Sequence, residues 1–383
     1  MSKYLITRNS LFSLSILACI VVSILLWVIL ASRTANAANP SLPSDINNDG
    51  IVDIFDLSIL LSNYGKTTST GDLSSPADGK VDMYDLSILL TNYGKTSGGT
   101  VSCAVSIPNV PDGPDPWGGC FPGPTNTGVP QGTNLMNYTG SCTVTGANVT
   151  IDSKTVNCSE LVVGMTTNLI IKNSIVNGLV YADEGNTGSV LIQDSEVNAG
   201  TTSFGAVSYD NITIIRSEIQ GGQHNVQCTK NCRVVDSWLH DSIVFGESHN
   251  NAFISNGGSD YSVEHTSLHC NRQPIGTAGC SADLSLFGDF APIERATVSR
   301  SLFVANSTGA SYCLYGGTGN SKPYDAQANT IKMIDNVFQR GTNNQCGVSG
   351  PVTGFLKPDG SYPTGNVWSG NVWSNGGAVL PSS

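Results

Sequence analysis

The chain has 383 residues, of which 39% are hydrophobic and only 12% are charged, and it contains 42 glycines. This composition allows a large buried core but does not favour a single helical domain, so we expect mostly β-structure. The formal net charge is −11, and the 18 Lys and Arg residues are spread thinly. A nucleic acid is therefore excluded as a partner, because phosphate binding needs clustered basic side chains.

Residues 1–40 have the pattern of an export signal. Lys3 and Arg8 precede an uncharged apolar run from Leu11 to Leu30, and a small-x-small cleavage pattern follows at Ala35-Asn36-Ala37. The run is also about long enough to cross a bilayer as a helix, so an uncleaved membrane anchor is the alternative to a signal peptide. Both interpretations place the rest of the chain outside the cell, either secreted or tethered to the outer face of the membrane.

Two copies of a loop–helix repeat occupy residues 45–96. Calcium takes about six to eight oxygen ligands, and a twelve-residue loop supplies them from positions 1, 3, 5, 7, 9 and 12, with glycine at position 6. The first loop has Gly50 at that turn. Its predicted ligands are Asp45, Asn47, Asp49, the Ile51 carbonyl, Asp53 and Asp56.

The second loop departs from this pattern at its front. Either Asp72 stands at position 1 with two residues inserted, or Ser74 does, and we favour Asp72 because it keeps the carboxylate. The alternative to a calcium site is a solvated acidic turn, which suits the second loop better than the first. The predicted ligands of the second loop are Asp72, Ser74, Asp78, the Lys80 carbonyl, Asp82 and Asp85.

An amphipathic helix is predicted after each loop. Leu57, Leu60, Leu61 and Tyr64 recur at helical spacing, Leu86, Leu89, Leu90 and Tyr93 repeat them, and Gly65 and Gly94 stand where each helix stops. With Asp rather than Glu at position 12 and no clear helix before each loop, the segment resembles a type I dockerin. This resemblance implies calcium-dependent docking to a cohesin-like scaffold or surface protein.

Ten cysteines follow Cys19 in a chain that we expect to be exported, and they predict disulfides rather than thiol chemistry. Their spacing suggests five local pairs, although sequence alone does not fix the connectivity, and Cys228 with Cys232 is open to interpretation as a metal pair. The expected pairs are Cys103–Cys120, Cys142–Cys158, Cys228–Cys232, Cys270–Cys280 and Cys313–Cys346.

Residues 97–130 are rich in Gly and Pro, which predicts a linker that merges into an N-terminal cap. Trp117, Cys120 and Phe121 indicate that this segment is packed and does not extend freely into solvent.

In residues 131–383, short β-branched runs recur with one signature: alternating apolar residues, a polar residue, then a small one. Successive polar positions lie 21, 22, 20, 29, 35 and 35 residues apart, and the first spacings match the length of one β-helix coil. The polar positions are Asn173, Asp194, Arg216, Asp236, His265, Arg300 and Asp335. The residues expected to stack inside are Ile175, Val197, Ile219, Leu239, Leu268 and Phe303.

This domain resembles the pectate-lyase-like β-helix superfamily. It is more similar to a group of secreted bacterial β-helix proteins that share Phe121-Pro-Gly-Pro-Thr-Asn-Thr-Gly-Val-Pro130, Gly288-Asp-Phe-Ala-Pro292 and Phe338-Gln-Arg-Gly341. The resemblance implies a right-handed parallel β-helix that acts on, or binds, a polysaccharide. The expected fold class is thus mainly β, with a small α-helical dockerin module in front.

All five histidines lie between His224 and His269. In the aligned repeats His240 falls above His269, while Asp236 and His265 share the other polar column. Such a patch has the groups for acid–base chemistry on a sugar, as paired carboxylates for hydrolysis or as a base beside a cation for uronate lysis. The alternative is a set of structural polar ladders. The candidate catalytic residues are His240, Asp241, His249, Glu264, His269 and Arg272.

Two functional hypotheses follow from these patterns. The first is an exported, dockerin-bearing enzyme that breaks down a polysaccharide by hydrolysis of O-glycosyl bonds or by uronate lysis. The second is a non-catalytic surface adhesin or carbohydrate-binding β-helix. Related β-helix sequences often have His-x-Asp-Gly where this chain has His249-Asn-Asn251-Ala252, and the missing acidic residue favours the second hypothesis.

Overall fold

The computed structural model describes residues 44–47, 52–74, 78–93, 102–319 and 321–383. The chain divides into two compact units, residues 1–100 and residues 101–383, which are described separately. The expected signal or anchor at 1–40 and the expected ligands Asp49 and Ile51 lie outside the described residues. Among the residues that are described, no helix combines the length and apolar character needed to span a bilayer.

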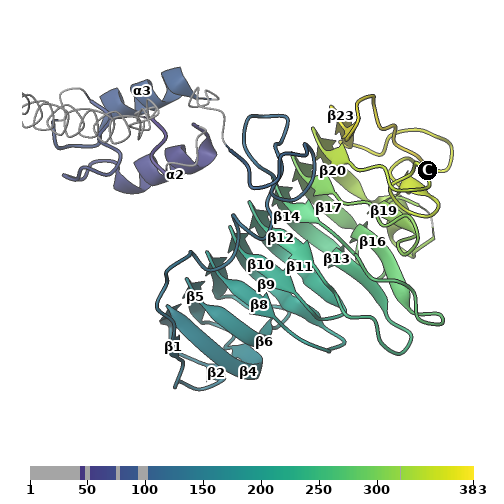
Figure 1. The fold of residues 1–383 in the computed structure, drawn as a ribbon, viewed down its shortest axis with the longest axis horizontal. Coiled ribbons are helices and arrows are strands. Elements are labelled where there is room, and N and C mark those ends of the chain that lie inside the picture. Colours follow the sequence, from purple (N-terminus) through teal and green to yellow (C-terminus); the bar gives the residue numbers. More distant parts are fainter. Residues whose placement is uncertain (1–43, 48–51, 75–77, 94–101, 320) are drawn as a thin grey trace, which may run out of the picture. The chain divides into compact units, whose positions relative to one another are not determined.

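The first unit contains two equivalent helices, α2 (Ile54–Asn63) and α3 (Met83–Asn92) (Figure 1). Each begins with a capping box, in which Asp53 or Asp82 accepts backbone N–H bonds of the first turn and the Asp three residues later bonds back. These helices were predicted from their apolar spacing. Their small core comprises Val52, Leu60, Leu73, Val81 and Leu89.

The predicted apolar stripe of each helix is only partly buried. Leu60 and Leu89 are fully buried, but Leu61 and Leu90 are 52% and 54% exposed, and the following tyrosines are also exposed. Two ten-residue helices offer too little facing surface to cover both neighbouring leucine rows, so one row of each helix remains open to solvent.

The second unit is a stack of short strands that belong to one 24-stranded sheet, and every pairing between its named strands is parallel. The first strands are β1 (Met136–Asn137), β2 (Thr143–Val144), β3 (Asn148–Asp152), β4 (Lys154–Val163), β5 (Asn168–Lys172), β6 (Ile175–Ala182), β7 (Ser189–Gln193) and β8 (Glu196–Asn198). Next come β9 (Gly205–Ile215), β10 (Glu218–Gln220), β11 (His224–Val235), β12 (Trp238–His240), β13 (His249–Ser255), β14 (Gly258–Glu264), β15 (Ser267–Leu268) and β16 (Gly279–Leu286). The last are β17 (Ile293–Ser299), β18 (Leu302–Phe303), β19 (Tyr312–Gly316), β20 (Asn329–Ile334), β21 (Val337–Phe338), β22 (Gly350–Thr353), β23 (Val367–Ser369) and β24 (Val372–Trp373), with a short 3-10 helix at Asp325–Gln327.

The strands form three rows along the stack (Figure 1). The first row runs from β3 through β5, β7, β9, β11, β14, β17 and β20 to β23. The second row runs from β6 through β8, β10, β12, β15, β18 and β21 to β24. The third row includes β6, β9, β11, β13, β16, β19 and β22. This arrangement is consistent with a parallel β-helix, and we refer to it as the solenoid.

A column of left-handed residues marks the bend between the first and second rows. The seven polar positions of the repeat all have φ between 42° and 55°, a region that favours Asn, Asp and Gly. The small residue that follows is buried, and in most coils its side chain accepts the backbone N–H of the equivalent residue one coil earlier, as Ser195 does for Ser174 at 3.1 Å. Asn371 continues this ladder by accepting the N–H of Asn336 at 3.0 Å. The predicted alignment of the repeats is thus confirmed.

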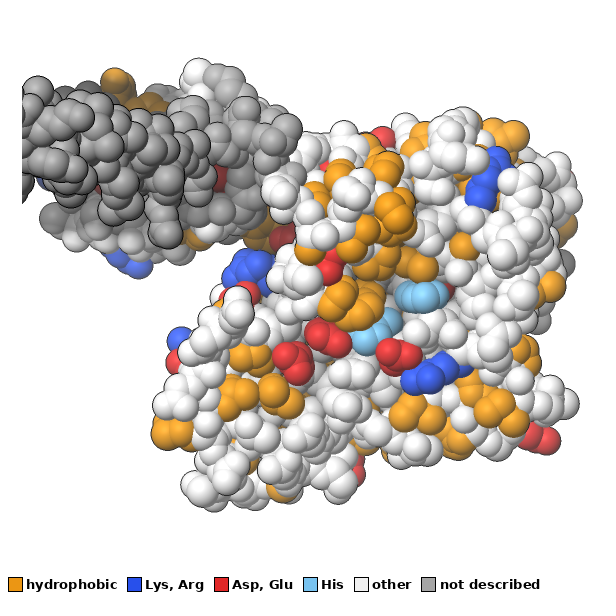
Figure 2. Space-filling view, viewed as in Figure 1, with side chains coloured by type: hydrophobic (Ala, Val, Ile, Leu, Met, Phe, Trp, Pro, Cys, Tyr) orange, Lys and Arg blue, Asp and Glu red, His pale blue; other side chains and the backbone are white. Residues whose placement is uncertain are grey.

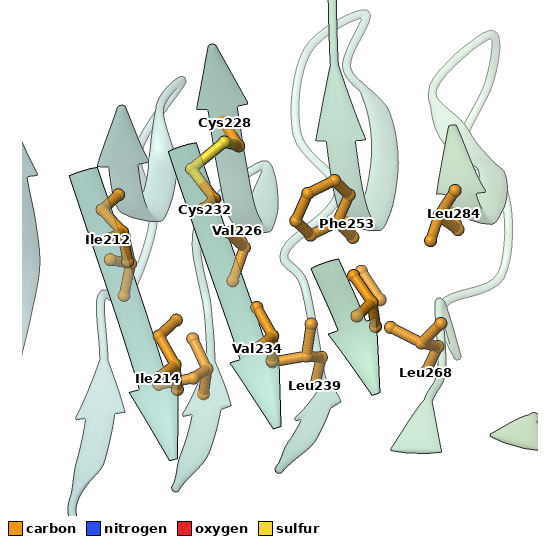
Figure 3. Close-up of a cluster of buried hydrophobic side chains, with 14 of the residues drawn as sticks. Ile212, Ile214, Val226, Cys228, Cys232, Val234, Leu239, Phe253, Leu268 and Leu284 are labelled. Atoms are coloured by element: carbon orange, nitrogen blue, oxygen red, sulfur yellow. A yellow bond between two sulfur atoms is a disulfide. The ribbon is translucent and has the colours of Figure 1, made fainter. Parts of the chain in front are cut away.

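All three rows contribute to the core, and Leu239 and Leu268 in Figure 3 belong to one inward column of the second row. The stack expected from the sequence is correct except at Ile175, which points outward, while the neighbouring Val176 is fully buried. Because side chains alternate along a strand, an offset of one residue moves a side chain to the opposite face. The inward column is Val176, Val197, Ile219, Leu239, Leu268, Phe303, Phe338 and Trp373.

All five expected disulfides are present. The bond between Cys228 and Cys232 lies within the core of the solenoid, as Figure 3 shows. It uses both sulfur atoms, so the alternative interpretation of these cysteines as a metal pair is wrong for the oxidised protein.

Residues 102–130, which we name the flank segment, pack along the side of the solenoid. Near the start of the segment, Asn109 donates to the carbonyl of Ser374 at 2.8 Å and accepts from Gln339 at 2.7 Å. Further on, Gly128 N–H donates to the carbonyl of Arg216 at 3.1 Å. The segment therefore follows the column of left-handed residues back toward the first coils, whereas the sequence predicted a linker that ends in a cap.

Two aromatic residues anchor the flank segment. Trp117 and Phe121 pack over Leu302, Val304 and Val337, which point outward from β18 and β21 or follow β18. Phe121 is fully buried by this contact. The predicted packing of Trp117 and Phe121 is confirmed, and the outward column of the second row is closed to solvent at these coils.

Candidate functional site

The same outward column carries acidic residues in the earlier coils. Glu196, Glu218 and Trp238 occupy equivalent positions of β8, β10 and β12. Two residues further along the strands, Gln220 and His240 form the neighbouring column, because residues i and i+2 share a face of a strand. We name Glu196, Glu218, Trp238, His240 and Asp241 the histidine–carboxylate cluster.

His240 is held on three sides. Its Nδ1 lies 2.8 Å from Asp241 Oδ2 and its Nε2 lies 3.0 Å from Glu218 Oε1. Its ring stacks on the indole of Trp238, with ring centroids 3.5 Å apart and planes inclined by 14°. Only 5% of the side chain is exposed, so ring orientation and hydrogen-bond partners are fixed together.

Asp241 is held in its ionised form. Burial raises the pKa of this carboxyl, but hydrogen bonds from Asn271 and His240 and the charge of Arg272 outweigh burial and lower the pKa below the usual value. Asn271 Nδ2 donates to Asp241 Oδ1 at 2.8 Å, and an Arg272 guanidinium nitrogen lies 3.1 Å from the same oxygen. Asp241 therefore supplies a permanent negative charge next to His240.

His269 lies one coil beyond His240, where its N–H donates to the carbonyl of Leu239 at 2.9 Å. Burial, together with the nearby His240, lowers the pKa of His269 to about 4. The ring is therefore neutral at neutral pH and retains one nitrogen able to accept a proton or a hydrogen bond.

Glu196 and Glu218 form a pair of carboxylates on adjacent coils, on strands about 4.8 Å apart. Burial raises the pKa of Glu196, the N–H of Val129 opposes this effect, and the charge of Glu218 raises the pKa further. Glu218 faces His240 instead. The two acids thus differ in environment, which is the usual arrangement for an acid and a base in one active site.

The structure brings together four of the six candidate catalytic residues: His240, Asp241, His269 and Arg272. His249 is exposed on β13 in the third row, and Glu264 pairs with Arg300 before the bend at His265. Neither residue joins the cluster. In Figure 2 histidine and acidic side chains gather on one face of the solenoid.

Sequence reasoning missed Glu196, Glu218 and Trp238. The signal was present, because all three occupy the residue after the small position of the aligned repeat. The alignment did not show whether the side chain at this position points into the core or toward solvent.

His265 and Asp236, which were expected to share a column, form a separate cluster with the flank segment. His265 Nδ1 lies 2.6 Å from Asp236 Oδ1, and its Nε2 lies 3.1 Å from Asp115 Oδ2. Burial lowers the pKa of this histidine, but the hydrogen bonds and charges of Asp115 and Asp236 outweigh burial and raise it to about 9. The imidazolium also stacks with Phe121. This cluster fastens the flank segment to the solenoid.

The last Asp of each acidic loop in the first unit accepts equivalent hydrogen bonds. Asp56 Oδ1 accepts the N–H groups of Ile46 and Asn47 at 2.6 and 3.1 Å. Asp85 Oδ1 accepts those of Leu73 and Ser74 at 2.7 and 3.0 Å. Asp72, which precedes Leu73, therefore matches Asp45, which precedes Ile46, and the two extra residues lie between Ser74 and Asp78.

The donor chemistry of the expected ligands that the structure describes fits a hard cation, because their side chains offer carboxylate, amide and hydroxyl oxygens. Asp72 Oδ2 accepts the N–H of Gly79 at 2.7 Å, which turns the second loop around this carboxylate. A metal could also be held by three His, Cys, Asp or Glu side chains whose ligand atoms all lie within 4.8 Å of one another. Within the described residues, one such group is present, and it consists of Asp283, Cys313 and Cys346. The disulfide between these two cysteines leaves no thiolate there to bind a metal.

Searches against protein-family models, curated proteins and solved structures found no match to this chain. The histidine–carboxylate cluster and the paired acidic loops are the features from which a function can be inferred.

Proposed function

We propose that the solenoid hydrolyses glycosidic bonds of a neutral polysaccharide at the histidine–carboxylate cluster. The observation that carries this proposal is the pair Glu196 and Glu218, which lie side by side but in different environments. Hydrolysis of a glycoside needs one carboxylic acid to protonate the leaving oxygen and one carboxylate to act as base or nucleophile. Glu196, with its raised pKa, is suited to the first role, and Glu218 to the second.

The other cluster residues position Glu218. Its carboxylate oxygen lies 3.0 Å from His240, whose ring is fixed by Asp241 and by Trp238. Asp241 is fixed in turn by Asn271 and Arg272. A chain of charged and hydrogen-bonded groups therefore holds one carboxylate in a single orientation, which a reacting group requires.

Hydrolysis is favoured over uronate lysis by the charge of the cluster. A lyase needs a cation that neutralises the acid group of its substrate, but Arg272 is already paired with Asp241. Glu218 and Asp241 remain as carboxylates when Glu196 is the protonated acid, so a uronate would meet like charge at this surface.

The second candidate is a non-catalytic carbohydrate-binding or adhesin role. It is favoured by His240, both of whose ring nitrogens already face carboxylates, as in a static polar ladder. Asn251 no longer supports this candidate, since it is fully buried against His224 and Ser285 and is remote from any surface chemistry.

For the first unit we propose a dockerin-type module that binds calcium and docks to a cohesin-like partner. The equivalent capping boxes and the matching bonds to Asp56 and Asp85 support a duplicated calcium loop. The equivalent exposure of Leu61 and Leu90 supports a docking surface. For the solenoid we propose a right-handed parallel β-helix like those of the pectate-lyase-like superfamily; the three rows of parallel strands support the β-helix, and the handedness follows from the resemblance. The disulfides support an extracellular location.

The test uses the full chain, purified in detergent with its disulfides formed. It is incubated with a panel of neutral and acidic polysaccharides while new reducing ends and the absorbance of unsaturated uronates are followed. New reducing ends from a neutral polymer, lost in Glu218→Gln but kept in the control Glu247→Gln at an exposed position, support hydrolysis. Unsaturated products would establish lysis instead, and binding without products would establish the non-catalytic role.

A further inference from the structure

A pocket of about 450 Å³ lies between the flank segment and the column of left-handed residues. Residues 124–131 form one wall, and Asp194 and Arg216 form the other. This volume falls in the usual range of ligand sites. The wall from the flank segment includes most of the Pro- and Gly-rich motif that the resemblance singled out, and the histidine–carboxylate cluster does not use it.

The solenoid side of the pocket carries a fixed polar pair. Arg216 Nε and Nη2 donate to the two oxygens of Asp194 at 2.7 and 2.9 Å. A guanidinium and a carboxylate joined by two hydrogen bonds offer donors and acceptors side by side, and the hydroxyl groups of a sugar both donate and accept. Pro124, Val129 and Pro130 add apolar surface on the opposite wall, suited to the C–H face of a sugar ring.

The pocket adjoins the histidine–carboxylate cluster through Glu196. The N–H of Val129, in the pocket wall, donates to Glu196 Oε1 at 3.4 Å. Gly128 has φ of +83°, and a Cβ atom there would lie 3.0 Å from Glu196 Cγ, so glycine allows the wall to approach this carboxyl closely. Glu196 is in turn the strand partner of Glu218.

We propose that this pocket binds one neutral sugar unit of the polysaccharide that is cut at the adjacent cluster, and that Arg216 and Asp194 determine its specificity. The inference rests on the proposed function, because continuity with Glu196 makes the occupant part of the same polymer. A neutral unit fits because Arg216 and Asp194 compensate each other's charge, so this pair offers little net positive charge to an acid group.

Binding and turnover are measured separately. Calorimetry on the full chain carrying Glu218→Gln uses cello-, xylo-, manno- and galactohexaose as probes. Arg216→Lys keeps the positive charge but loses the two-point geometry, and Asp194→Asn keeps the size of the partner. Each change is expected to lower the affinity for the tightest-binding hexaose by about tenfold, which is the effect of losing one charge-assisted hydrogen bond. In the otherwise unmodified enzyme they should raise KM with little change in kcat.

The matched control is Arg295→Lys. Arg295 binds Asp260 through the same two nitrogens at 2.7 and 3.1 Å and also has a positive φ, but it lies outside the pocket. Hexaose affinity should be unchanged in this variant, and both lysine variants should melt at the temperature of the parent.

The outcomes separate the two proposals. Turnover that responds equally to Arg216→Lys and Arg295→Lys overturns the subsite and leaves hydrolysis standing. If Arg216→Lys weakens hexaose binding but the protein releases no product from any polysaccharide, the subsite is supported and hydrolysis is contradicted. Absence of hexaose binding to the Glu218→Gln protein overturns the subsite.

Discussion

Glu196 and Glu218 occupy the same position of adjacent coils, yet only Glu218 reaches His240, at 3.0 Å, while Glu196 accepts the N–H of Val129 from the flank segment. A repeat that would otherwise present two equal acids is thus made asymmetric by a segment from outside the repeat. Burial raises the pKa of Glu196, and proximity to Glu218 adds to the shift. Two roles in acid–base chemistry become possible from one repeated residue type.

The pH dependence of turnover should follow from the state of Glu196. A general acid must be protonated, so the rate falls as the pH rises through its pKa, and a raised pKa moves this fall toward neutral pH. Glu196→Gln is expected to lower kcat by roughly 100-fold to 10,000-fold and to remove the alkaline fall from a kcat/KM profile. A variant profile with the same alkaline fall as the parent would assign the acid to another group.

The stability of the solenoid should decline at alkaline pH because of His265. Its pKa is raised from an ordinary value near 6.5 to about 9 in the folded protein. A raised pKa contributes stability that is complete below pH 6.5 and is lost as the pH rises through about 9. This shift in the pKa of His265 corresponds to a contribution on the order of 3 kcal/mol to the free energy of unfolding.

Urea unfolding of the full chain at intervals between pH 6 and pH 10 measures this decline. His265→Gln should flatten the pH dependence, because a neutral amide cannot gain charge between Asp115 and Asp236. The control His249→Gln, at an exposed ring, should retain it. Equal profiles for the two variants would show that the cluster of His265, Asp115 and Asp236 contributes nothing to the pH dependence of stability.

How much the sequence revealed depends on how local each feature is. The place of Asp194 in the repeat and the disulfide between Cys228 and Cys232 were predicted because both depend on short spacings. The prediction that Ile175 points inward was wrong, because apolar character does not show which face of a strand a residue occupies. A shift of one residue along the strand moves the side chain to the opposite face.

The candidate site was predictable only in part, for a different reason. His240 and His269 could be aligned from the repeat, but whether an outward column is open depends on contacts remote in sequence. At Leu302 the column is covered by Phe121, while at Glu218 it is partly open. Nothing in the spacing of residues 102–130 indicates which coils they cover.

The buried ladder of small polar side chains should contribute measurably to stability. Ser217 is fully buried, and its hydroxyl accepts the N–H of Ser195 at 3.2 Å. Ser217→Ala leaves that buried N–H without an acceptor, at an expected cost of about 1–3 kcal/mol in the free energy of unfolding. Urea unfolding measures it, with the exposed Ser189→Ala as the control. A cost equal to that of the control would mean that the ladder follows the fold without stabilising it.

Calcium titration of the full chain should reveal two unequal sites. The first loop has the regular spacing, whereas the second has two extra residues between Ser74 and Asp78, and longer loops order at a greater entropic cost. Isothermal titration is therefore expected to give a tighter site removed by Asp45→Asn and a weaker site removed by Asp72→Asn. Since the bonds to Asp85 make Asp72 the counterpart of Asp45, Ser74→Ala should weaken the second site less than Asp72→Asn does. Two equal tight sites, or no heat of binding at all, would contradict the proposed loops.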